Sequence, residues 1–232
     1  MNIILFGIQG AGKGTQARAI ALALGIPVFE AGAELRKLAL LETPEGGMIR
    51  SLINQGKLVP PGIVMTRIAS FLDDTATLDG VVFDGVPRSL DQAVALDEIL
   101  DRKHRTSMAV EIRISEQCST ERVLQRRLCS RCGTAFLPEY HHNTCNLCGG
   151  LLVKRVDDTA EALKTRIANY QNRTLPVLEY YRKANKLITV NGEQLVLDVT
   201  RDVFTQLSPL LHTEKDIEQL LFQSSRDNQV SI

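Results

Sequence analysis

The chain has 232 residues, 44% of them hydrophobic and 23% charged, which is enough for one domain with insertions or for two small domains. Its 27 basic and 27 acidic residues give a formal net charge of zero, so no overall field draws it to nucleic acid or to an anionic membrane. No cationic leader precedes the first apolar residues, and we expect neither a signal peptide nor a membrane span but a cytoplasmic protein.

A glycine-rich stretch, residues 7–15, lies between residues 2–6, which indicate a buried strand, and residues 16–24, which indicate a helix. Glycines let backbone N–H groups face an anion, the helix N-terminus adds partial positive charge, and Lys13 adds a full one. The common template has Ser or Thr directly after the lysine, whereas here Gly14 takes that place and the hydroxyl residue comes one position later. Strand, loop and helix in this order favour a polyphosphate-binding loop over an ordinary glycine-rich turn.

The following segments predict a second parallel strand at residues 25–29 and then helices at 31–42, 48–54 and 63–72. A glycine ends the middle helix, and two consecutive prolines separate it from the next. The stretch at 30–59 therefore reads as a small helical insertion.

Residues 81–84 form an apolar run that ends in Asp84, as expected at the carboxyl edge of a parallel sheet, where ligands bind. Beyond it, the pattern predicts a helix at 89–100, an alternating strand at 108–114 and a helix at 119–128. Within that last helix, two arginines spaced four apart are expected to share one face.

The C-terminal third predicts a long helix from Thr159, with Asp158 and Glu161 spaced like a capping pair and Pro176 dividing it. Residues 187–190 and 195–199 then supply closing strands. Beyond Pro209 the pattern weakens, although three apolar residues between 217 and 221 are spaced for a short helix. We assign the tail, 210–232, no role.

Four of the five cysteines form two pairs with two residues inside each pair and twelve between the pairs. Two such knuckles present four thiolates in the arrangement that tetrahedral Zn²⁺ prefers, and a glycine follows each pair. A closed four-sulfur site has no position for a reactive water, so its role is structural. The predicted ligands are Cys129, Cys132, Cys145 and Cys148.

Several motifs in one order resemble the adenylate kinase family, in the form whose lid carries four cysteines, over about residues 1–205. They are Gly-Ala-Gly-Lys-Gly-Thr-Gln at 10–16, Gly-Lys-Leu-Val at 56–59, Asp-Gly-Val-Pro-Arg at 84–88 with Gln92 beyond, Arg122 with Arg126, and Arg155 with Arg166. The resemblance implies an α/β fold, with a P-loop kinase core whose five-stranded parallel sheet is flanked by helices. It also implies a core at 1–29, 60–125 and 160–209, a nucleoside-monophosphate-binding (NMP-binding) subdomain at 30–59 and a zinc-binding lid at 126–159.

By the same resemblance, the ATP site comprises Gly10, Ala11, Gly12, Lys13, Gly14, Thr15, Arg122 and Arg126. The AMP site comprises Ala31, Arg36, Lys57, Leu58, Val59, Gly85, Val86, Pro87, Arg88, Gln92, Arg155 and Arg166. The residues implied in catalysis are Lys13, Asp84, Arg88, Arg126, Arg155 and Arg166, with Asp84 holding Mg²⁺ through water and Asp157 and Asp158 acting in lid closure. No general base is needed, because the attacking phosphate oxygen is already anionic.

The leading hypothesis is thus reversible Mg²⁺-dependent transfer from ATP to AMP by a monomer that binds no nucleic acid or membrane. The sequence departs from the family's usual residues at Gln9, Ala31, Ala33 and Val86, and Ala31 removes a hydroxyl from the monophosphate site. A kinase for another nucleoside monophosphate therefore stays open. A nucleotide-gated zinc ribbon for nucleic acid is a third reading, disfavoured by the neutral charge and the lack of an aromatic stacking surface.

Overall fold

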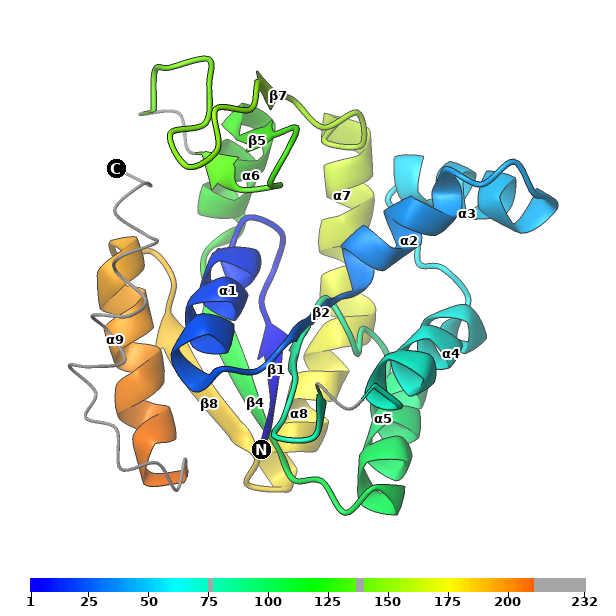
Figure 1. Ribbon diagram of the computed structural model, residues 1–232, viewed down its shortest axis with the longest axis vertical. Coiled ribbons are helices and arrows are strands. Elements are labelled where there is room, and N and C mark those ends of the chain that lie inside the picture. Colours follow the sequence, from blue (N-terminus) through cyan, green and yellow to red (C-terminus); the bar gives the residue numbers. More distant parts are fainter. Residues whose placement is uncertain (75–76, 137–139, 211–232) are drawn as a thin grey trace.

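The computed structural model describes residues 1–74, 77–136 and 140–210 (Figure 1). Its centre is a five-stranded sheet in the order β2-β3-β1-β4-β8, in which every neighbouring pair is parallel. The strands are β1 Asn2–Phe6, β2 Val28–Glu30, β3 Val82–Asp84, β4 Ser107–Arg113 and β8 Leu187–Asn191. The predicted α/β fold with a five-stranded parallel sheet is confirmed.

Helices cover both faces of this sheet because successive β1 side chains point to opposite sides. Ile3 and Leu5 pack with residues of two helices, Lys13–Leu24 and Val196–Leu207, whereas Ile4 and Phe6 pack with residues of three others, Pro61–Leu72, Leu90–Arg102 and Leu175–Lys183. The helices are α1 Lys13–Leu24, α2 Ala31–Ala39, α3 Pro44–Asn54, α4 Pro61–Leu72, α5 Leu90–Arg102, α6 Glu116–Gln125, α7 Ala160–Asn169, α8 Leu175–Lys183 and α9 Val196–Leu207. The result is a three-layer core that fixes the carboxyl ends of the strands.

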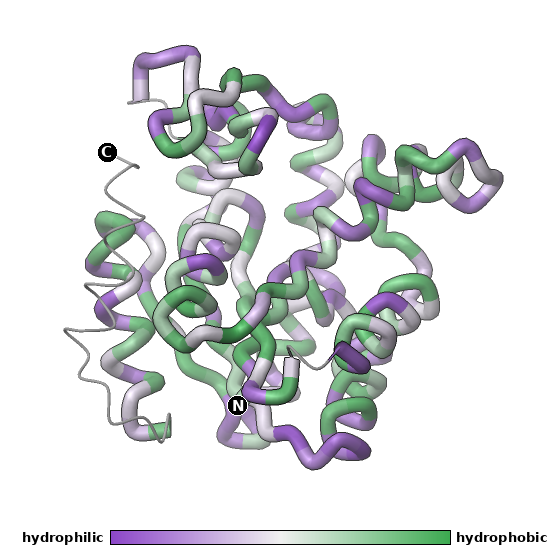
Figure 2. Tube along the Cα trace, viewed as in Figure 1, coloured by the Kyte–Doolittle hydropathy of each residue, from purple (hydrophilic) through white to green (hydrophobic). Residues whose placement is uncertain are grey.

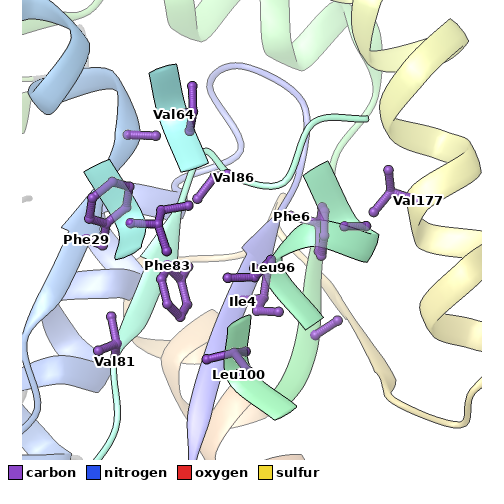
Figure 3. Packing of buried hydrophobic residues seen from close by; sticks show 14 of the residues in the cluster. Ile4, Phe6, Phe29, Val64, Val81, Phe83, Val86, Leu96, Leu100 and Val177 are labelled. Atoms are coloured by element: carbon purple, nitrogen blue, oxygen red, sulfur yellow. The ribbon is translucent and has the colours of Figure 1, made fainter. Parts of the chain in front are cut away.

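The second of these faces is shown in close-up in Figure 3, where aromatic and aliphatic side chains interdigitate beneath the phosphate loop. Phe83 is fully buried, and its ring lies 6.1 Å from that of Phe29 on the neighbouring strand. Leu96 of α5 and Val177 of α8 complete the layer and are also fully buried. This packing anchors β3, the strand that carries Asp84.

Two smaller units stand at the carboxyl edge of the sheet, on opposite sides of the phosphate loop (Figure 1). One comprises α2 and α3, which share a small apolar cluster around Ile49. The other is an antiparallel sheet in the order β6-β5-β7, with the cysteine loops attached to it. Its strands are β5 Arg127–Cys129, β6 Ala135–Phe136 and β7 Leu152–Val153.

The described residues of the cysteine unit form only a small apolar core of their own. Phe136 and Tyr140 pack with ring centroids 4.5 Å apart, beside the buried Cys129 and Cys145. In Figure 2 the central strands of the main sheet are largely green, whereas this unit is interspersed with purple. A segment with so little apolar burial needs a further crosslink to stay folded.

Several local predictions are wrong. Helix α2 ends at Ala39 rather than at residue 42, and α3 begins at Pro44 rather than at residue 48. The predicted strand at 195–199 is instead the start of α9, since Val199, Val203 and Phe204 recur at helical spacing and pack on the core. The predicted helix at 119–128 ends at Gln125, because residues 127–129 pair in β5, so Arg126 lies beyond the helix.

A further wrong prediction concerns the cap of the long helix. The Thr159 hydroxyl accepts a hydrogen bond from the backbone N–H of Ala162 and caps α7 in place of the predicted Asp158. A π-helical turn, Tyr170–Thr174, separates α7 from α8, and Pro176 stands in the first turn of α8, so the predicted division at this proline is confirmed. The helix suggested between 217 and 221 lies outside the described residues, among which no helix is both long and apolar enough to cross a membrane.

Candidate active site

The glycine-rich loop folds around the side chain of its own lysine. Lys13 Nζ donates hydrogen bonds to the carbonyl oxygens of Gly7, at 2.7 Å, and Ile8, at 3.0 Å. Gly7 has a φ of 151°, and a Cβ there would lie 2.6 Å from the Ile112 carbonyl oxygen. Only glycine fits that position, and the loop can therefore curl tightly at the end of β1.

Burial lowers the pKa of Lys13 to about 8, although the neighbouring Asp84 carboxylate opposes the shift. Asp84 ends β3, in register with Leu5 of β1, and is 8% exposed. A Cβ at Gly14 would lie 3.4 Å from Asp84 Oδ2, so the residue that replaces the usual Ser or Thr leaves this carboxylate directly against the loop. Burial raises the pKa of Asp84, Lys13 opposes that shift, and Glu30 adds to it.

A cavity of about 1800 Å³ opens over the loop between the two smaller units. Most small-molecule sites have roughly 300–1,000 Å³, so this one has room for two nucleotides. All the residues predicted to bind nucleotides line it except Val86 and Pro87. Those two line an adjoining space of about 30 Å³ together with Lys13, Arg88 and Arg166.

Three arginines of the cavity are held by two neighbouring carboxylates. Arg126 donates to both oxygens of Asp158, through Nε at 2.7 Å and Nη2 at 2.9 Å. Arg155 forms the same bidentate pair with Asp157. Arg166 donates to both Asp157 and Asp158 and so bridges them. Burial would raise the pKa of Asp157, but the Arg155 and Arg166 guanidiniums outweigh it and hold that pKa below its ordinary value.

Arg88 is positioned by the backbone around it. Its Nε donates to the carbonyl oxygen of Gly85 at 2.7 Å, and its carbonyl oxygen accepts from the Thr174 hydroxyl. The backbone N–H of Arg88 donates to Gln92 Oε1 at 2.8 Å. The Gln92 side chain thus fixes the turn that carries Arg88, and its amide oxygen already accepts a hydrogen bond from the Arg88 backbone.

Arg122 joins the phosphate loop to the segment after β8. Its Nη1 lies 2.9 Å from the carbonyl oxygen of Gly192 and 3.5 Å from that of Gly10. The residues from 192 to 199 line the cavity, which sequence reasoning missed because it assigned residues 195–199 to a strand. An Asn-Gly pair, Asn191-Gly192, at the carboxyl end of the last parallel strand was the available signal.

Glu30 is a second residue that the sequence did not single out. It ends β2, lines the cavity and lies 3.6 Å from Arg36, one of the predicted monophosphate ligands. Its position at the carboxyl end of a parallel strand, next to Asp84, could have identified it.

The four predicted metal ligands meet in one cluster, with all four sulfur atoms within 4.8 Å of one another. The Sγ atoms of Cys129 and Cys148 are 3.4 Å apart, and those of Cys132 and Cys145 are 3.7 Å apart. Zinc–sulfur bonds of about 2.3 Å in a tetrahedron place sulfurs about 3.8 Å apart, so the donors fit such an ion. The backbone N–H groups of Arg131 and Cys132 lie 3.4 Å from Cys129 Sγ, as in a metal knuckle.

The chain is similar to a family model and to known proteins over most of its length. A family model described as adenylate kinase matches residues 5–186. An adenylate kinase of Clostridium tetani is 37% identical over 216 residues, which cover 91% of this chain and 98% of that protein. Adenylate kinases of Thermosipho melanesiensis and Methanocella arvoryzae are 36% and 38% identical, each over 208 residues that cover 88% of this chain and 97% and 96% of their own lengths.

Proposed function

The chain belongs to the adenylate kinase family and is a phosphotransferase, and on this basis we propose that it catalyses the reversible reaction ATP + AMP = 2 ADP with Mg²⁺. One observation carries the proposal. Cationic side chains from separate segments of the chain line a single cavity over the lysine of the phosphate loop. A pocket of that charge and size suits two nucleotides whose phosphates meet.

We assign the donor nucleotide to the phosphate-loop side of the cavity. Backbone N–H groups of the loop, the N-terminus of α1 and Lys13 bind the ATP phosphates, and Arg122 lies against its base. The acceptor binds on the side of α2, where Arg36 and Arg88 contact its phosphate and Gln92 faces its base. In this arrangement the acceptor phosphate oxygen points at the terminal phosphorus of ATP.

The chemistry requires alignment and charge neutralisation more than proton transfer. The acceptor oxygen is anionic near neutral pH, so the residues hold it in line and stabilise negative charge that spreads in the transition state. Arg126, Arg155 and Arg166 perform this role when they exchange Asp157 and Asp158 for phosphate oxygens. Such an exchange couples nucleotide binding to movement of the cysteine unit.

Asp84 is the residue that fits a role toward Mg²⁺. It offers a hard oxygen donor beside the loop, and Mg²⁺ in phosphate sites needs only one or two carboxylates besides phosphate and water. Bound there with ATP, the ion would neutralise charge on the phosphates. Asp84 would hold the ion, and Lys13, whose Nζ donates to the carbonyl oxygens of Gly7 and Ile8, keeps the loop curled where the phosphates would bind.

We assign residues 126–159 to a lid, residues 30–59 to the acceptor subdomain, and the remainder up to 209 to the core. The four-cysteine cluster would hold a structural Zn²⁺, which would crosslink the lid. A stiff lid can close as one body and exclude water, the competing acceptor.

A second candidate acceptor is a nucleoside monophosphate with another base. Ala31 is 3% exposed and offers no side-chain hydrogen bond at the monophosphate site. The side-chain amide oxygen of Gln92 already accepts a hydrogen bond from the backbone N–H of Arg88. A lost hydrogen bond is worth about 0.5–1.5 kcal/mol, which weakens acceptor binding without changing the reaction.

The test is a coupled assay for ADP with ATP and a panel of AMP, GMP, CMP and UMP. We expect AMP to give the highest kcat/KM. A faster reaction with another monophosphate would reassign the acceptor, and the absence of ADP formation with all four would overturn the proposed function.

A further inference from the structure

An ion pair lies inside the acceptor side of the cavity and has no place in the reaction described above. Arg36 Nη2 is 3.6 Å from Glu30 Oε1, with the two side chains 38% and 43% exposed. Both residues line the cavity. A carboxylate therefore stands at a guanidinium that, by the function proposed above, binds a phosphate.

The local backbone brings the two groups together. Side chains of a helix tilt toward its N-terminus, so Arg36 of α2 reaches back along the helix. Its guanidinium passes over Gly32, where a Cβ would lie 3.1 Å from Nη1. Glu30 is the N-cap residue of α2, yet its side chain makes no capping hydrogen bond and faces the guanidinium instead. Gly32 thus leaves the space that the pair occupies.

The negative charge of Glu30 also acts on Asp84. Glu30 and Asp84 are register partners at the ends of adjacent parallel strands, so their side chains leave the same face of the sheet. Glu30 contributes to the raised pKa of Asp84, after burial and against Lys13. An incoming phosphate dianion at Arg36 therefore meets a carboxylate in addition to its cationic ligand.

We propose that Glu30 sets the affinity of the acceptor site by competing with the acceptor phosphate for Arg36. The carboxylate neutralises the guanidinium while the site is free of nucleotide, and the phosphate must displace it on binding. Because the pair is partly exposed, the displaced carboxylate can turn to solvent at little cost. Glu30 thereby weakens binding of the acceptor more than binding of the donor, because Arg36 lies on the acceptor side of the cavity.

If Glu30 instead positions Arg36 for phosphate binding, the change in acceptor affinity on removing the carboxylate has the opposite sign. If the carboxylate holds the guanidinium in its productive orientation, removing the charge weakens acceptor binding. The sign of one measured change thus separates competition from positioning.

The experiment compares the wild type with Glu30→Gln, Glu30→Asp and Glu34→Gln. Glu34 is the matched control, because it forms an ion pair with Lys37 on the same helix at 2.6 Å. The readouts are steady-state KM for AMP and for ATP, and the Kd for AMP from calorimetry without ATP. We expect Glu30→Gln to lower KM and Kd for AMP by about three- to tenfold, because Arg36 loses its competing partner, with KM for ATP within about twofold. Glu30→Asp and Glu34→Gln should stay within about twofold of wild type.

Two further results bear on the inference. In an Arg36→Ala background, Glu30→Gln should change the Kd for AMP less than twofold, because the group contested by the two anions is gone. Glu30→Gln with unchanged or raised Kd for AMP overturns the inference, as does an equal effect in the Arg36→Ala background. If the wild type forms no ADP, the proposed function fails, and the change in Kd for AMP still decides for or against competition.

Discussion

Replacing Asp158 by Asn tests the charge network that joins the cysteine unit to α7. The Asp158 side chain is 5% exposed and accepts hydrogen bonds from Arg126 at 2.7 and 2.9 Å and from Arg166 at 3.2 Å. Removing one partner of a buried ion pair costs about 3–5 kcal/mol, because the other charge stays buried without compensation. Asparagine keeps one acceptor oxygen and Asp157 still contacts Arg166, so we expect about 3 kcal/mol.

For a chain of this length, each kcal/mol shifts the melting temperature by about 2–4 °C, so Asp158→Asn should melt about 6–12 °C lower. Differential scanning calorimetry measures the melting temperature, and urea titration measures the free energy of unfolding independently. Asp73→Asn is the control, since Asp73 pairs with Lys103 at 2.8 Å but is 72% exposed, and such pairs contribute at most about 1 kcal/mol. A loss for Asp158→Asn no larger than that of Asp73→Asn would refute the reasoning.

Three other outcomes follow from the same geometry. Removing the metal with a chelator should lower the melting temperature while ATP still binds to the core loop, and melting unchanged after verified metal loss would exclude a structural role. Since the pKa of Lys13 lies at about 8 and ATP binding needs its charged form, the Kd for ATP should rise about tenfold between pH 7 and 9, and a flat titration profile would contradict this role. Gly56→Ala should destabilise the chain by more than about 1 kcal/mol in urea titration, because its φ is 69° and a Cβ would lie 2.3 Å from the Ala162 carbonyl oxygen; wild-type stability would refute the clash.

Features encoded by adjacent residues could be predicted from the sequence. The phosphate loop follows from glycines and one lysine between a strand and a helix, and the cysteine cluster follows from two short spacings. Asp84 was identified because an apolar strand that ends in a carboxylate places that group at the binding edge of a parallel sheet. Each of these depends on a local pattern.

Features decided by tertiary packing could not be predicted in the same way. Residues 195–199 are apolar in a pattern that suits a strand or a helix, and contact with α1 selects the helix. Arg126 leaves its helix because the next residues pair in β5, and Asp158 binds arginines while Thr159 caps α7. Glu30 could not be singled out because its contact with Arg36 forms only when α2 brings the guanidinium back to the end of β2.

The central claim is that cationic side chains from separate segments act together on one transferred phosphoryl group, and Arg88→Ala tests it most directly. Arg88 lies in the cavity with its Nε bound to the Gly85 carbonyl oxygen. Steady-state kinetics with ATP and AMP should show kcat reduced by about 10³-fold or more, as for other arginines that stabilise phosphoryl transfer. As a control, Arg102→Ala should leave kcat within about twofold, because Arg102 is an exposed residue in the last turn of α5. A loss of less than tenfold for Arg88→Ala would contradict the account.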